Sequence, residues 1–186
     1  MTRLARGYVG INHQTIGSDI LAVYRAVHSP DRMFGPELAG RLARVQAEQW
    51  YPIALLLEAL AALDAKLDAF AMRSAGWQLF KLSHEEATRK AVKNARELLY
   101  GFDGLYHAAN RGLRIGGWSV LSFEPGRAEL EKTTPHHCVL EEGIMEEALR
   151  VIGAPSKVEQ PKCFRQGADA CVFVVTATGA NANWGA

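Results

Sequence analysis

The amino-acid sequence predicts an α+β protein in which amino-terminal helices pack on an antiparallel sheet of about four strands. Through most of the first hundred residues, apolar side chains recur at helical spacing. Two pairs of strand-like runs, each joined by a turn that contains glycine, follow at 113–133 and 157–176. One helix-like stretch, 134–152, separates the two pairs. The expected order of elements is therefore helices, hairpin, helix, hairpin.

Three helices are expected in the amino-terminal part. Residues 15–28 carry apolar side chains at helical spacing and end at the Ser29–Pro30 pair, which disfavours a continuing helix. Pro36 opens a second helix, and residues 53–72 are apolar almost all round. Such a helix is buried at the centre of a fold or in a subunit interface. Because residues 53–63 offer more apolar surface than one small sheet covers, we expect a homodimer through these helices.

The next expected elements are a helix and the first hairpin. Ser83 and Glu86 have the spacing of a capping box, which predicts a helix over 84–99. Residues 113–123 then have strand character, Pro125–Gly126 forms a turn, and 128–133 returns as the partner strand.

The last helix and hairpin hold all three cysteines. Thr134 followed by Pro135 is typical of a helix entry, and the helix is expected to stop at Gly153. The second hairpin joins 157–164 to 170–176. If its turn is centred on Gly167, Cys163 and Cys171 lie directly opposite each other on one face. Their Cβ atoms would then be about 4.5–5.5 Å apart, near enough to share a metal ion or, with adjustment, a disulfide.

Bulk properties exclude several classes of protein. The chain has 186 residues, 48% hydrophobic and 22% charged, and its net charge of +1 gives no electrostatic case for nucleic acid or an anionic membrane. No apolar run spans a bilayer, and the start has no signal-peptide core. Three cysteines without secretory context indicate reduced thiols or metal ligands. We therefore expect a cytoplasmic protein that binds neither nucleic acid nor membrane.

The carboxy-terminal half resembles the 4-vinyl reductase domain. That domain belongs to the ligand-binding superfamily that includes the haem–nitric-oxide-binding domains and the small subunits of the vesicle-tethering TRAPP complex. The resemblance is strongest over 105–178 and rests on a glycine in the last helix and a Cys–Gly–Asp–Cys pattern in the hairpin: Gly143, Cys163, Gly167, Asp169 and Cys171. It implies that residues 1–186 form a single small-molecule-binding domain with the arrangement of helices and hairpins given above.

The resemblance also implies a metal site. Phenol-sensing transcription activators with domains of this kind hold a zinc ion through three cysteines and one glutamate, and Cys138, Cys163 and Cys171 match the three cysteines. Gln160 stands at the position of the glutamate, so Glu159 or His137 would have to supply the fourth ligand. The alternative is that the three cysteines are small, buried, metal-free core residues, where free cysteine commonly lies.

A ligand cavity is the second candidate site. Aromatic residues of the middle segment could line an apolar pocket, and a tyrosine, a histidine and a tryptophan could supply its polar groups: Trp77, Phe80, Tyr106, His107 and Trp118. The alternative is that these rings are ordinary core. A haem protein needs an axial ligand and a large pocket. The Tyr-x-Ser-x-Arg signature of the haem-binding relatives is missing from the sequence, which argues against haem.

These observations leave three interpretations of function. The first is a stand-alone sensor or carrier that binds a small hydrophobic molecule and signals through a separate protein partner. The second is a dimeric interaction module with a structural zinc or thiol cluster and no ligand, and the third is a haem-binding gas sensor. No nucleophile elbow, phosphate-binding loop or dinucleotide motif is present, so we do not expect an enzyme.

Overall fold

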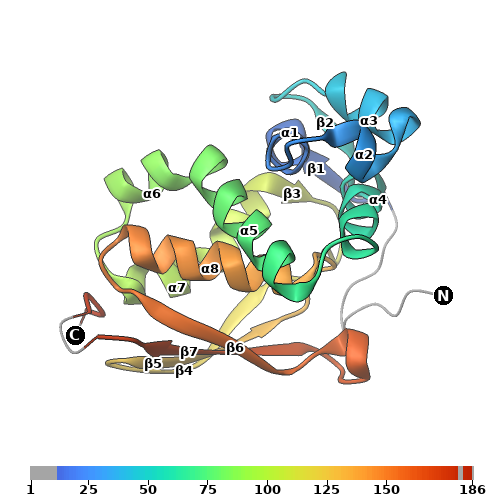
Figure 1. Ribbon diagram of the computed structural model, residues 1–186. Coiled ribbons are helices and arrows are strands. Elements are labelled where there is room, and N and C mark those ends of the chain that lie inside the picture. Colours follow the sequence, from blue (N-terminus) through green and yellow to red (C-terminus); the bar gives the residue numbers. More distant parts are fainter. Residues whose placement is uncertain (1–11, 180–181, 186) are drawn as a thin grey trace.

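The computed structural model describes residues 12–179 and 182–185. Helices lie on one face of the larger of two antiparallel sheets (Figure 1). The helices are α1 (Gly17–Arg25), α2 (Pro30–Phe34), α3 (Pro36–Ala43), α4 (Ile53–Asp64), α5 (Ala69–Ser83), α6 (Glu85–Ala91), α7 (Ala95–Ala109) and α8 (Cys138–Val151). The strands are β1 (Gln14–Ile16), β2 (Trp50–Pro52), β3 (Asn110–Arg111), β4 (Trp118–Glu124), β5 (Arg127–Lys132), β6 (Ser156–Lys162) and β7 (Cys171–Ala177).

The larger sheet confirms the predicted hairpin–helix–hairpin arrangement. Its strand order is β4-β5-β7-β6, so the two hairpins meet along β5 and β7, and α8 connects them. Leu130 lies opposite Phe173 and Lys132 opposite Cys171. Because side chains alternate along a strand, Ala128, Leu130 and Lys132 share one face of β5, and all three are buried. The fold class predicted from the sequence is therefore correct.

A β-bulge sets the register of the second hairpin. Glu159 pairs with Val174, but Lys162 pairs with Val172, so the register shifts by one residue between them. Pro161 lies inside the shift, where its missing N–H costs no ladder hydrogen bond. The shift places Cys163 opposite Cys171 as predicted, and a short 3₁₀ turn (Phe164–Gln166) leads to Gly167 at φ 112°.

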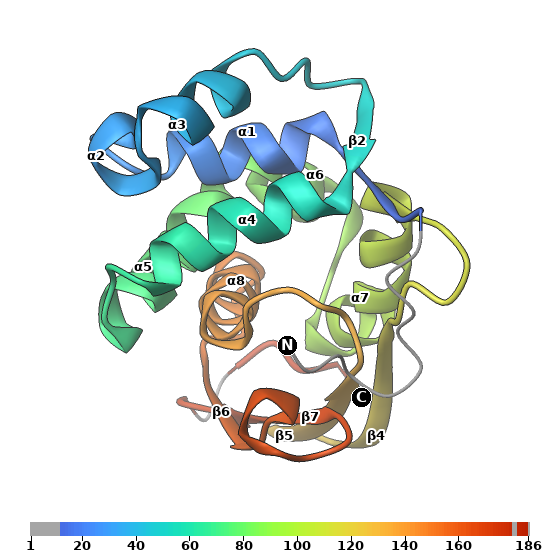
Figure 2. The same cartoon turned by 90° about the vertical axis from the view of Figure 1, so that its right-hand side faces the viewer.

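Helix α8 lies between two hydrophobic cores. Figure 2 shows it end-on, with α4 and α5 above it and the larger sheet below. One core is formed by the amino-terminal helices and includes Leu140 of α8. The other is formed by α7, α8 and the sheet, and the half-buried Ile144 packs against both cores. The α8 segment therefore connects the helical and sheet parts of the molecule.

Several expected boundaries are wrong. Helix α8 begins at Cys138 rather than at Thr134, whose hydroxyl instead contacts Glu141 Oε1 at 3.4 Å. The expected helix over 84–99 is two helices, because Asn94 caps a new one by accepting from the Glu97 N–H at 2.9 Å. Ser83 ends α5, so the expected capping box does not form.

Other features were not predicted. Strands β1, β2 and β3 form a small sheet that joins the end of α7 to the amino-terminal helices. Within the described residues, no helix is both long and apolar enough to cross a membrane.

Helix α4 contributes little large apolar surface to the exterior. Its leucines at 56, 60 and 63 are buried in the helical core. The large hydrophobic side chains that are exposed among the described residues come from other segments: Phe70, Leu82, Tyr100, Leu105, Leu113 and Leu121. The expected homodimer through residues 53–63 therefore stays a prediction without support from exposed apolar surface on α4.

Two glycines allow α5 and α8 to cross closely. A Cβ atom on Gly76 would lie 2.1 Å from the backbone oxygen of Leu140, and one on Gly143 would lie 2.0 Å from that of Arg73. Cβ atoms cannot approach backbone so closely, so any larger residue would push the helices apart. Gly143, one of the residues that carries the family resemblance, is explained by this packing.

We predict that Gly143→Ala destabilises the protein by about 3 kcal/mol, because relief of the clash needs movement of backbone rather than of a flexible side chain. Gly104→Ala on α7 is the matched control, since no described atom lies within 4 Å of the added Cβ. That change should stabilise by about 0.5–1 kcal/mol. Urea unfolding measures both, and equal effects of the two substitutions would contradict the close-crossing explanation.

Candidate functional site

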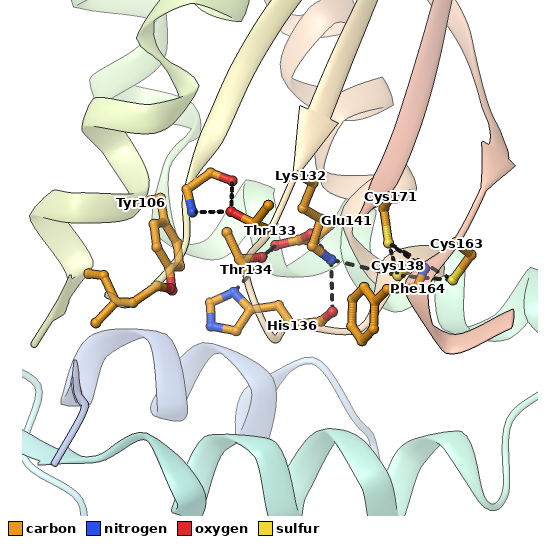
Figure 3. Close-up of polar contacts among 12 residues, drawn as sticks. Tyr106, Lys132, Thr133, Thr134, His136, Cys138, Glu141, Cys163, Phe164 and Cys171 are labelled. Carbon is orange, nitrogen blue, oxygen red and sulfur yellow. Dashed lines mark hydrogen bonds and ion pairs between the residues drawn. The ribbon is translucent and has the colours of Figure 1, made fainter. Parts of the chain in front are cut away.

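The three cysteines converge in the core. Cys138 is the first residue of α8, Cys171 the first of β7, and Cys163 follows β6 directly. The Sγ of Cys138 lies 3.3 Å from that of Cys171 and 3.6 Å from that of Cys163, and the third separation is 3.9 Å (Figure 3). All three side chains are buried and unbridged.

These separations fit a single metal ion. Zinc binds thiolate sulfur at about 2.3 Å in tetrahedral geometry, which places neighbouring sulfurs about 3.8 Å apart. The observed values of 3.3, 3.6 and 3.9 Å scatter around that length. The cluster could therefore hold a metal with little rearrangement of the chain.

The thiols differ in acidity. A hydrogen bond from Cys171 and the charge of Lys132 lower the pKa of Cys138 to about 5, although burial opposes this. The same hydrogen bond, together with burial, raises the pKa of Cys171. Burial also raises the pKa of Cys163. At neutral pH the cluster thus holds one thiolate, at Cys138, and two thiols.

A buried lysine lies beside the thiolate. The side chain of Lys132 is fully buried, and its Nζ contacts the Cys138 sulfur at 3.8 Å and donates to the His136 carbonyl oxygen at 2.7 Å. It also forms an ion pair with Glu141. Burial alone would lower the pKa of Lys132, but the Glu141 carboxylate and the cysteines outweigh burial and raise it. Lys132 is therefore a buried cation whose partners are all on or next to α8 and β7.

Glu141 carries the ion pair on to a histidine. Burial would raise its pKa, but Lys132 and His136 lower it, so the carboxylate is charged. Its Oε1 lies 3.3 Å from Nδ1 of His136 (Figure 3). A carboxylate can only accept, so Nδ1 carries the proton. In neutral imidazole the other nitrogen, Nε2, is then an acceptor, and among the described residues this buried atom has no partner.

His136 lines a cavity of about 100 Å³. Three of the aromatic residues expected at a pocket, Phe80, Tyr106 and Trp118, also line it. The Tyr106 hydroxyl donates to the Ile115 carbonyl oxygen at 2.5 Å, so its proton is already used. The remaining lining comes from the amino-terminal helices, α7 and α8: Asp19, His84, Leu98, Phe102, Leu105, Ala109, Asn110, Glu141 and Ile144.

Two other expected cavity residues lie elsewhere. Trp77 faces the outer side of α8, where its Nε1 donates to Glu146 at 3.2 Å. His107 is 46% exposed and lies 3.4 Å from Asp103. The cavity therefore consists of Phe80, Tyr106 and Trp118 from the expected set, without Trp77 and His107.

The two candidates for a fourth metal ligand also differ in position. Glu159 is 57% exposed and accepts from Lys157 at 2.7 Å, so it points away from the sulfurs. His137 Nε2 lies 2.8 Å from Asp64 Oδ1. Gln160, by contrast, is close enough to Cys138 for its amide to help lower the pKa of that thiol. The side chain beside the sulfurs is therefore the glutamine at the family's glutamate position.

Sequence reasoning missed Lys132, Glu141, His136 and Asp19 as parts of the site. One signal was available, because Lys132 continues the inward-facing alternation of Ala128 and Leu130, and a charge on that face needs a buried partner. The partner could not be found from the sequence, since Glu141 stands among four glutamates on one predicted helix.

Comparisons with known proteins agree with this geometry. Residues 124–177, which include the cysteines, Lys132 and Glu141, match the family model of the 4-vinyl reductase domain. The fold is similar to that of an Fe(II) unliganded H-NOX protein from K. algicida, with a TM-score of 0.65 at 11% identity over 88% of this chain and 97% of that one. An H-NOX protein from S. oneidensis in the Fe(II)NO state gives 0.65 at 15% identity, over 88% and 99%.

The chain therefore belongs to the ligand-binding superfamily of the 4-vinyl reductase domain, whose fold H-NOX proteins share, which confirms the resemblance found in the sequence. No curated protein matches the chain in sequence. No catalytic family is among the matches reported above.

We predict that Lys132→Met destabilises the protein by about 3–5 kcal/mol, because it leaves Glu141 charged and buried without its cation. Adding Glu141→Gln should recover part of the loss, since the amide keeps an acceptor for His136 without the charge. Lys157→Met breaks an exposed ion pair with Glu159 and should cost at most about 1 kcal/mol. Denaturant unfolding of the four proteins checks this, and a loss no larger for Lys132→Met than for Lys157→Met would contradict the role given to Lys132.

Proposed function

We propose that this protein is a small-molecule sensor or carrier whose cavity binds a neutral, mainly apolar ligand that donates one hydrogen bond. The observation that carries the proposal is the unpartnered Nε2 of His136 in that cavity. A buried acceptor without a donor costs free energy, and a ligand hydroxyl or N–H would satisfy it.

Size and charge narrow the ligand class. An engineered apolar cavity of about 150 Å³ holds benzene, so a cavity of about 100 Å³ suits a molecule no larger than a single ring. Asp19 reaches the cavity from α1, and burial raises the pKa of its carboxyl group. A ligand anion beside that group would be disfavoured, which supports a neutral ligand.

Phenol and benzene test the proposal as a matched pair of probes. We predict that phenol binds about 3–10 times more tightly than benzene, as expected for one neutral hydrogen bond of about 0.5–1.5 kcal/mol. His136→Phe should abolish the preference, whereas His107→Phe, outside the cavity, should keep it. Calorimetric titration measures all three proteins, and equal preference in wild type and His136→Phe would refute the assignment of His136.

We further propose that Cys138, Cys163 and Cys171 hold a structural zinc ion. The support is the sulfur geometry and the match of this segment to the 4-vinyl reductase domain. Zinc would neutralise the thiolates and hold β6, β7 and the start of α8 together, and its binding would then contribute directly to folding. Gln160 occupies the fourth side, and an amide oxygen is a weaker ligand for zinc than a carboxylate.

Gln160→Glu should therefore increase zinc affinity at least about tenfold, because it adds an anionic oxygen ligand to three thiolates. Cys163→Ser should lose the metal, and Glu159→Gln, which changes an exposed carboxylate, should not alter affinity. Competition with a chromophoric chelator measures the affinities. Elemental analysis that finds no zinc in wild type and in Gln160→Glu protein would contradict the zinc proposal and leave buried thiols.

Haem is a second candidate, favoured by one observation. The similar H-NOX structures are described in their Fe(II) states, and His136 Nε2 has the free lone pair of an axial ligand. The cavity of about 100 Å³, however, does not fit a porphyrin, which is several times larger than benzene. Titration with haemin should give no saturable Soret shift, and a stoichiometric shift that His136→Phe removes would establish haem binding instead.

Signal output and assembly complete the proposal. A sensor of this size would act through a separate protein partner. Native mass spectrometry separates it from a dimeric interaction module, because a ligand that leaves with the purified protein supports the sensor and a bare dimer supports the module.

A further inference from the structure

A second cavity, of about 370 Å³, reaches the cysteine cluster from the side opposite the ligand cavity. We refer to it as the vestibule, and its lining includes Asp64, His137, Cys138, Gln160, Cys163 and Arg165. Cys171 is not part of the lining. Elsewhere the sulfurs are covered, since Lys132 is fully buried against Cys138, and the backbone N–H of the buried Phe164 donates to Cys171. The vestibule is therefore the open approach to the sulfurs among the described residues.

One carboxylate holds three segments together at the vestibule. Asp64, the last residue of α4, accepts from His137 Nε2 at 2.8 Å with one oxygen and forms an ion pair with Arg165 through the other. His137 immediately precedes α8, and Arg165 lies in the turn between β6 and β7. The end of α4 is thereby attached to the two segments that carry Cys138 and Cys163.

The vestibule also presents unsatisfied polar atoms. The His137 side chain is only 9% exposed, and its Nδ1 has no partner among the described residues. The buried Gln160 Nε2 likewise makes no hydrogen bond that meets standard geometry. Buried polar atoms without partners at an opening to three sulfurs favour a polar or ionic occupant over an apolar one.

We propose that the vestibule is the site through which the cysteine cluster takes up a thiophilic divalent cation, and that the Asp64 bridges limit the rate of entry. The cation would exchange its waters for His137 and then for the sulfurs as the thiols release their protons to solvent. Exposed bridges of this kind are weak and open readily. Their loss should therefore change the rate of access far more than the final affinity. The inference rests on the proposed metal binding.

The test uses reduced, metal-free protein and two stopped-flow readouts, the reaction of the thiols with DTNB and the appearance of cobalt(II)–thiolate absorbance. Asp64→Ala and Arg165→Ala should each accelerate both reactions by roughly three- to tenfold, the change expected when a weak surface bridge is lost. The final amount of bound cobalt should not change. Glu58→Ala is the matched control, because it removes a carboxylate and an ion pair with Arg41 one to two turns earlier on α4. Its rates should equal those of wild type.

Wild-type rates in both Asp64→Ala and Arg165→Ala would overturn the proposal, as would an equal acceleration by Glu58→Ala, which would indicate general loosening of α4. Failure of every protein to bind cobalt would refute the metal site itself. The DTNB rates would then still decide whether the vestibule is the route to the thiols.

Discussion

The buried ion pair between Lys132 and Glu141 is the interaction on which the site depends. It joins the end of β5 to the first turns of α8, and neither charge is exposed to solvent. Two charges removed from water are tolerated only when they stay paired and hydrogen-bonded. Lys132 meets this condition through the His136 carbonyl oxygen, and Glu141 meets it through His136 and Thr134. The pair therefore fixes the segment between β5 and α8 in one conformation.

The ligand cavity and the cysteine cluster share this segment. Cys138 and His136 are two residues apart, and one faces the sulfurs while the other faces the cavity. Lys132 contacts the sulfur of one and the carbonyl oxygen of the other. A metal at Cys138 and a ligand at His136 would therefore act on the same few residues. Each would stabilise the conformation that the other requires.

Part of this arrangement could be predicted from the sequence because it is local. The turn at Gly167 and the strands beside it predict that Cys163 and Cys171 face each other, and the helix before them begins at the third cysteine. The pairing nevertheless depends on the bulge at Pro161, since an unshifted register would place Cys163 opposite Ala170. Phe80, Tyr106 and Trp118 were identified because large aromatic rings are common in cavity walls. Trp77 was misplaced, because spacing along α5 does not reveal on which side of α8 each ring lies.

The ionic part of the site could not be predicted, because its partners are distant in the sequence or ambiguous. Lys132 marks itself as unusual on an apolar strand face, but the choice of Glu141 depends on how α8 is rotated against the sheet. That rotation is set by the glycine crossing with α5, a contact between segments far apart in the chain. The acceptor role of His136 depends in turn on Glu141, so it becomes visible only in three dimensions.

The central claim is that Glu141 holds His136 with its proton on Nδ1 and a free lone pair on Nε2. Nitrogen-15 NMR of the histidine rings measures this directly, because protonated and unprotonated ring nitrogens have well-separated chemical shifts. The account predicts a neutral His136 ring with the proton on Nδ1. A proton on Nε2 would contradict it, since His136 would then donate into the cavity and the ligand would have to be an acceptor.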